Sequence, residues 1–492
     1  MSSTNRVALA LIREAVLGAL PNNPIIKAQR ITGAPNLGMQ PSTITSNEIR
    51  PDRQIADLIL VGSEAGGDEA FELSFRSQDD LLEGALFNRY VRQPFREGAS
   101  ITSIGAGSAT VVDTSGAGGG VFAAGDIVYA EGFAVANNNG IFVLTAGSGT
   151  SLTAAGWTAE ASPPTTAKLI RVGKQAGAGD VVAVTAGGTR LTSTTLNFTT
   201  LGLGVGQWIK IGNANIVAQS YATAGANAFA RITSIAANAL GLFVDNTFVA
   251  DAGAGKTIGI YFSDFLTNGT TRQSFAVEER FTDHNPETVQ VVLGNVIDTL
   301  SIEFEPQAIV TGTATFFGTT GAVYNPTAPG DYSNIYSGVV TRDTAPASQV
   351  LNTSTNVARF ARGGTRIVGP NYIRNFTMEV ANNLRRLEAV GVFGAADIGE
   401  GEFSVTGDIE TYFGDKAMLE AVINNTETSL DCVVRDNEFH AYVFDLPRIK
   451  FSEGQPDVPG KNDDVVINLS YQAIRHATLG YTASVSRFWY AR

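Results

Sequence analysis

The sequence predicts a mainly β protein with two similar halves, each a β-barrel or sandwich with one short α-helix, plus small inserted β modules. Three observations support this fold class. Only 16% of the 492 residues are charged and 53 are glycine, a composition that favours strands and tight turns over helices. Apolar and polar residues alternate in many short stretches, as in half-buried strands. A strand followed by a helix also occurs twice, near residues 68–88 and over 398–425.

The N-terminal segment allows two interpretations. Val7 and Leu11 stand at helical spacing, so residues 1–24 could form a helix. The turn-forming sequence Pro-Asn-Asn-Pro at 21–24 could equally end an extended arm. Residues 25–32 then have the composition of a strand.

A polar, proline-containing segment follows at residues 33–54. It cannot build a core by itself, so we expect either a mobile loop or an arm that a partner orders. Residues 55–61 predict a strand, and Gly66 and Gly67 are expected to turn it.

The first strand-and-helix unit begins at residue 71, where apolar and polar residues alternate up to Arg76. We expect Ser77 to cap the helix, and Asp79 and Asp80 to favour its dipole in the first turn. The helix should be about three turns long. Its predicted packing stripe is Leu81, Leu82, Ala85 and Leu86.

The second unit has the same order. Its alternating apolar residues are Phe403, Val405, Ile409 and Phe413, and Asp415 can cap the helix. The predicted packing stripe of this helix is Met418, Leu419, Val422 and Ile423. The sequence LEGALFN at 82–88 corresponds to LEAVINN at 419–425, within one residue.

The composition changes between the two units, where charged residues become rare and Gly, Ala and Thr dominate. We expect an insertion at 99–271 that forms two small antiparallel β-barrels or sandwiches, about 99–173 and 174–262, as an exposed decoration. The first half would then comprise residues 1–98 with 272–335, and the second half residues 336–492.

The sequence gives no indication of a catalytic or metal site. The single cysteine, Cys432, excludes an intramolecular disulfide and a multi-cysteine zinc site. GAGKT at 253–257 lacks the first glycine of a phosphate-binding loop and is followed by a strand-like sequence. We therefore expect no enzyme activity and no cofactor.

The overall charge also excludes classes of partner. A net charge of −13 disfavours tight binding to nucleic acid or to an anionic membrane. No stretch approaches the roughly 20 apolar residues of a membrane span, so we expect no membrane insertion.

The order of these motifs resembles a known family. Residues 46–88, from SNEIRPDRQ through FELS to DDLLEG, resemble the start of tail tube proteins (major tail proteins) from bacteriophages with long, non-contractile, siphovirus-type tails. QSFAVEERF at 273–281 and VTGTATFFG at 310–318 also resemble the family. GDIETYFGD at 407–415 and the long stretch at 445–473 complete the resemblance, and the insertion resembles the Ig-like decorating modules of some members.

The resemblance implies a structural virion protein of the phage tail, assembled in the cytoplasm of the host bacterium. Its copies would form stacked rings around a lumen through which DNA is ejected. The implied partners are other copies of the chain, a tape measure protein in the lumen, tail terminator and tail tip proteins, and passing double-stranded DNA that is not specifically bound. Because the strand-and-helix unit is duplicated, we favour a trimeric ring with pseudo-sixfold symmetry over a hexamer.

Specific residues follow from this interpretation. The arm between rings or subunits would present Glu48, Ile49, Arg50, Asp52, Arg53, Gln54 and Asp57. Acidic residues on the two repeated strands could face the lumen, where their negative charge would prevent tight binding of the DNA phosphates. These residues are Glu69, Glu72, Glu402, Asp408 and Glu410. The packing residues of the helices would be Leu81, Leu82, Leu86, Leu419, Val422 and Ile423.

Two alternatives remain open at this point. A β-rich surface protein or adhesin would share this composition. A carbohydrate-binding tail accessory would instead use exposed aromatic residues of the insertion, such as Phe133, Trp157 and Trp208.

Overall fold

A computed structural model describes residues 3–33, 35–111, 121–367 and 371–492. Short parts of the N-terminal segment (1–2), the polar arm (34), the first inserted module (112–120) and the second half (368–370) lie outside the described residues. The predicted fold class is confirmed. The chain is mainly β, with two large sheets and, among the described residues, two α-helices, α1 (Asp79–Ala85) and α2 (Ala417–Ile423).

The first half is organised around the 17-residue strand β20. The first part of β20 pairs with β19 and β22, and its last part pairs with β21 and β26. A β-bulge between Ile297 and Thr299 marks the change of partners. The strands of this half are β1 (Val7–Arg13), β2 (Ile25–Ala28), β3 (Gly38–Thr45), β4 (Leu58–Glu72), β19 (Phe275–Phe281), β20 (Thr288–Phe304), β21 (Thr311–Gly318) and β22 (Thr320–Tyr324). β23 (Thr341–Asp343) lies beyond the expected boundary at residue 335 and pairs in parallel with β2.

The second half repeats this layout around the 17-residue strand β31. The strands β29, β32, β31, β30 and β24 pair in that order, as β4, β21, β20, β19 and β1 do in the first half. The strands of this half are β24 (Val357–Arg362), β25 (Thr365–Arg366), β26 (Ile373–Ala381), β27 (Arg385–Leu387), β28 (Asp397–Gly399), β29 (Ser404–Tyr412), β30 (Thr428–Arg435), β31 (Ala441–Asp457), β32 (Val466–Ala473) and β33 (Ser484–Phe488).

The helices follow the same repeat. Each has seven residues, and α2 begins 338 positions after α1 (79 to 417). Each is followed two positions later by a residue with positive φ, Phe87 (48°) and Asn425 (47°). This register is one residue away from the sequence alignment. The helix α1 is also shorter than the predicted three turns.

Ser77 does not cap α1. The cap position is Gln78, without a side-chain cap, and Ser77 Oγ instead accepts a 2.8 Å hydrogen bond from Ser74 Oγ. The capping prediction was therefore wrong. Ser77 lies one residue before the cap position, and its hydroxyl oxygen is hydrogen-bonded to Ser74 and not to the helix.

The N-terminal residues form a strand, so the helical interpretation of 1–24 is wrong. β1 pairs with β19 along its whole length and also with β2. Four consecutive residues, Leu9 to Ile12, are buried. Burial on both faces of a strand erases the alternation that would have distinguished it from a helix.

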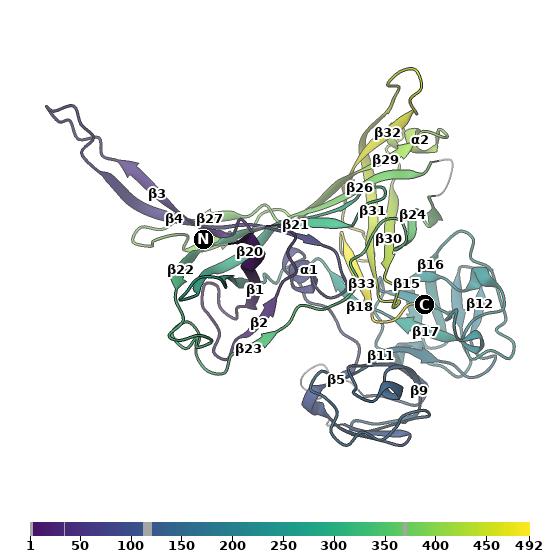
Figure 1. The fold of residues 1–492 in the computed structure, drawn as a ribbon. Coiled ribbons are helices and arrows are strands. Elements are labelled where there is room, and N and C mark those ends of the chain that lie inside the picture. The colour runs from purple at the N-terminus through teal and green to yellow at the C-terminus, as the bar shows by residue number, and fades with distance from the viewer. Residues whose placement is uncertain (1–2, 34, 112–120, 368–370) are drawn as a thin grey trace.

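The polar segment is an ordered hairpin of β3 and β4 that extends far from the body as an arm (Figure 1). Of its three prolines, Pro41 lies within β3, an edge strand, where a missing N–H is tolerated. The expected turn at Gly66 and Gly67 is wrong, since β4 passes straight through both residues. Gly67 has φ 138°, and a Cβ there would lie 1.7 Å from the carbonyl oxygen of Asn36. A Cβ at Gly66 would likewise lie 2.2 Å from the carbonyl oxygen of Phe316, so both glycines allow close approach of neighbouring backbone.

The insertion holds two hydrophobic clusters, one among residues 101–169 and one among 176–262. The strand β11 joins them by pairing with β8 and with β17. The strands here are β5 (Phe95–Glu97), β6 (Ile101–Gly105), β7 (Ser108–Val111), β8 (Asp126–Glu131), β9 (Gly140–Gly147), β10 (Ser151–Ala154), β11 (Lys168–Gln175), β12 (Val182–Val184), β13 (Arg190–Thr192), β14 (Trp208–Ile211), β15 (Phe229–Ala236), β16 (Ala239–Val244), β17 (Gly259–Phe262) and β18 (Asp264–Thr267).

Candidate assembly surfaces

The tip of the arm carries every residue predicted for it, and all are exposed: Glu48, Ile49, Arg50, Asp52, Arg53, Gln54 and Asp57. The loop is held by local polar contacts. The guanidinium of Arg50 pairs with Asp52 at 3.1 Å, and this contact lowers the pKa of the Asp52 carboxyl. The amide of Ser46 donates to the carbonyl of Asp57. The loop is therefore shaped within the arm itself, while its outer side chains remain free for a neighbour.

The arm also exposes an apolar surface that the sequence reading did not single out. Four consecutive residues of β4, Leu58 to Val61, are 48–62% exposed, and Ile44 opposite them is 59% exposed. Two strands alone cannot bury both of their faces. An exposed apolar hairpin of this kind is a site for association with another surface. The signal in the sequence was the unbroken run Leu-Ile-Leu-Val at 58–61.

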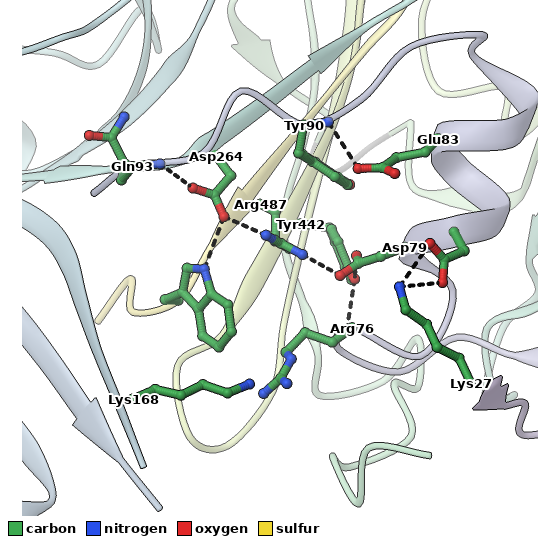
Figure 2. Close-up of polar contacts among 12 residues, drawn as sticks. Lys27, Arg76, Asp79, Glu83, Tyr90, Gln93, Lys168, Asp264, Tyr442 and Arg487 are labelled. Carbon is green, nitrogen blue, oxygen red and sulfur yellow. Dashed lines mark hydrogen bonds and ion pairs between the residues drawn. The ribbon is translucent and has the colours of Figure 1, made fainter. Parts of the chain in front are cut away.

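A buried charge network joins the two halves and the insertion (Figure 2). Arg487 on β33 pairs with Asp79 at the start of α1 and, at 2.5 Å, with Asp264 on β18. Asp264 also accepts hydrogen bonds from the indole N–H of Trp489 (2.9 Å) and from the backbone N–H of Gln93 (2.8 Å). The network therefore connects the first helix, both ends of the insertion and the last strand of the chain.

The acidic first turn of α1 has further partners. Tyr442 on β31 donates to Asp79 at 2.7 Å. Asp80 pairs with Arg13 on β1 and Lys27 on β2. These carboxylates do more than favour the helix dipole, because each fixes α1 to a strand from a distant part of the chain.

The two helices differ sharply in burial. In α1, the residues from Asp80 to Ala85 are buried, whereas in α2 only Met418 is buried. Of the predicted packing residues, Leu81, Leu82 and Leu86 lie in the main core, Leu419 and Val422 are partly buried against it, and Ile423 is 72% exposed. The prediction that Ile423 packs within the chain is therefore wrong, because the described residues leave that end of α2 uncovered.

The predicted acidic residues do not share one face. Glu69 is 1% exposed, whereas Glu72 is half-buried and Glu402 and Asp408 are exposed. Glu410 is half-buried and pairs with Arg374 at 3.0 Å. Glu69 and Glu72 are an odd number of residues apart, so strand alternation points them to opposite faces. A lumen-facing position for Glu69 is therefore wrong.

The comparison with known families decides the identity of the chain. The model of the phage tail tube protein family matches residues 4–473. The chain belongs to this family. The tail tube protein is therefore a structural, non-enzymatic component of the virion tail, and its copies assemble into the tail tube. No curated protein matches the chain.

The alternative of an aromatic sugar-binding platform on this tail tube protein is wrong, because Phe133, Trp157 and Trp208 are at most 7% exposed. Within the described ranges, no group of three or more His, Cys, Asp or Glu side chains could hold a metal ion. No helix in the described part of the chain is long and apolar enough to cross a membrane.

The charge network gives a stability prediction for the unassembled tail tube protein. Arg487→Met would leave the buried Asp264 without its cation, so we expect the free energy of unfolding to fall by about 3–5 kcal/mol. Urea denaturation followed by tryptophan fluorescence measures this. The control is Lys416→Met, which breaks an exposed i,i+4 pair with Glu420 and should leave the midpoint unchanged. Equal effects of the two substitutions would contradict the role assigned to Arg487.

Glu69 gives a pH prediction. Burial raises its pKa from 4.5 to about 8, and one carboxylate oxygen has no hydrogen-bond partner. The folded state therefore holds a proton that the unfolded state releases above pH 4.5. Stability should fall as pH rises from about 5 to 8, by up to about 1.4 kcal/mol for each pH unit.

Glu69→Gln should remove this slope, and urea denaturation at pH 5, 6.5 and 8 measures it. Glu279, whose pKa burial raises to about 7, adds a slope of the same sign up to about pH 7 in both proteins, so its contribution cancels in the difference between them. Parallel stability curves for the two proteins would show that Glu69 does not titrate in this range.

Proposed function

We propose that three copies of the chain form each ring of the tail tube, with pseudo-sixfold symmetry, in place of six copies. The observation that supports this is the pairing of β20 with β26, from Thr299–Ala381 to Phe304–Phe376, which makes the two halves of one chain a continuous sheet. Because the halves share one layout, the same junction formed between chains would close a ring of three.

The repeat indicates which edges would meet. In the first half, Leu37 (5% exposed) occupies the position that Val380 of β26 (2% exposed) has in the second. In the repeat, the last part of β31 is equivalent to the last part of β20, which pairs with β26. The segment around Leu37 in one copy would therefore pair with residues 453–457 of the next, which satisfies backbone groups at both edges.

We assign the tube to a long, non-contractile tail of siphovirus type, on the motif order of residues 46–88 and 407–473. Before ejection the lumen would hold a tape measure protein, and terminator and tip proteins would close the tube ends. The halves would be residues 1–98 with 272–335 and residues 336–492. The insertion at 99–271 would form two Ig-like decorating modules, which its two hydrophobic clusters support.

The lumen surface in this proposal includes Asp408 and Glu410, which alternate on one face of β29, together with the nearby Glu402 and the counterpart Glu72 on β4. A lumen with carboxylates repels the DNA phosphates and lets the duplex pass without being held.

The number of copies in a ring can be measured by electron cryomicroscopy of assembled tubes. Three copies predict three pairs of inserted modules around each ring, while the inner wall repeats six times. A protein with residues 99–262 removed should give the same inner wall with no outer projections. Six pairs of modules in one ring would contradict the trimer and support the hexamer.

The charge of the lumen can be tested in phage particles. Replacing Glu402, Asp408 and Glu410 together with Lys should slow receptor-triggered DNA ejection, by up to tenfold at low salt and less at high salt. A control variant with lysines at the exposed residues Asn137, Thr145 and Asn215 of the inserted modules adds three positive charges away from the lumen, against a change of six charges in the triple-lysine variant. If tubes of the triple-lysine variant assemble normally and eject DNA at the normal rate, the proposal that these three residues face the lumen is contradicted.

A further inference from the structure

The second half has a groove at a place that a hairpin fills in the first half. It has a volume of about 670 Å³ and lies between the body and the second inserted module. Glu427, Pro447, Arg448 and His476 line it from the body, and Phe243 lines it from the module. Arg448 and Glu427 form an ion pair there, at 33% and 46% side-chain exposure.

The corresponding place in the first half is filled by the hairpin of β27 and β28. Arg272 pairs with Asp397 at 3.1 Å, and the Ala395 amide donates to the carbonyl of Thr319 at 3.3 Å. Ile398 is 1% exposed and belongs to a hydrophobic cluster with Val296 and Phe87. The first half is thus covered by a hairpin that comes from the second half.

Strand pairing relates the two places. Gly312 pairs with Phe71 in the first half, and Leu469 pairs with Ile409 in the second. Seven residues beyond Gly312 is Thr319, which contacts the hairpin. Seven residues beyond Leu469 is His476, which lines the groove. The groove is therefore the uncovered counterpart of the hairpin site.

The arm holds the same place in the repeat as the covering hairpin. The hairpin of β27 and β28 leads into β29, and the arm leads into the central part of β4. The step of 338 residues that relates the helices relates Ile398 to Leu60 and Ala395 to Asp57. Ile398 is buried, whereas Leu60 is 53% exposed. Figure 1 shows the arm pointing away from its own second half, so its own groove is not its target.

We propose that the groove of each copy receives residues 57–60 of the arm of a second copy in the same ring. Leu58 and Leu60 then face apolar atoms of Pro447 and Phe243, and Asp57 lies beside His476 and Arg448. The exposed end of α2, at Ile423, becomes covered by the same neighbour. This inference rests on the proposed ring and assigns the start of β4, beside the arm loop, to contacts within a ring, leaving the loop residues 48–54 for the adjacent ring.

Cysteine cross-linking in assembled tubes tests the docking. The only native cysteine, Cys432, is buried, so it gives no background. Asp57→Cys combined with His476→Cys should form disulfides under mild oxidation in tubes, at least tenfold more than in unassembled subunits. Leu60→Cys with Pro447→Cys is a second pair that retains Asp57 and His476. Ile49→Cys with His476→Cys, which places one cysteine at the arm tip, is the matched control and should not cross-link.

The size of the product distinguishes the possibilities. Each copy donates one arm and receives one, so a ring of three gives closed covalent trimers on a non-reducing gel. Covalent hexamers would support the docking and contradict the three-copy ring. Intact tubes in which neither pair forms disulfides would overturn the inference. Covalent products that contain more copies than one ring would also overturn it, because they show contacts between rings. Neither result would contradict tube formation. Failure of the unaltered protein to form tubes would instead contradict tube assembly itself, on which both the proposed three-copy ring and the docking rest.

Discussion

The pairing of β20 with β26 is the contact on which the rest of the architecture depends. It places two copies of one strand-and-helix unit side by side in a continuous sheet. The buried contacts between the halves follow from that placement. Arg487 can reach Asp79, and Tyr442 can donate to the same carboxylate, because β26 holds the second half beside α1.

The two halves have diverged in what covers them. The helix α1 is surrounded by strands of both halves, whereas α2 contacts chiefly its own half and leaves Ile423 in solvent. The arm of β3 and β4 is long and apolar, whereas its counterpart of β27 and β28 is short and already docked. The exposed Ile423 and Leu60 thus have buried equivalents in the other half, Ala85 and Ile398, which is the pattern expected when a joint within a chain is repeated between chains.

Local patterns in the sequence were sufficient for the fold class, the repeat and the exposed arm. Alternation around Phe71 and Ile409 and the helical stripe at Leu81 depend on neighbouring residues only. The predictions were wrong where residues distant in the sequence determine the local conformation or burial. Gly67 was read as a turn, but its conformation is needed because Asn36 passes within contact distance. Glu69 was placed on the surface, although its strand is buried on that face. The network of Asp79, Asp264 and Arg487 has no local signature at all.

The covalent link between the halves changes how a ring can form. A contact within one chain forms at an effective concentration set by the connecting segment, whatever the amount of protein in the cell. Contacts between chains depend on protein concentration and cost the translational and rotational freedom of each incoming copy. In this chain the junction of β20 and β26 is already made when folding ends. Only the junctions at the free edges then remain sensitive to concentration, so the growth of a tube would require fewer encounters than the number of barrel halves in it.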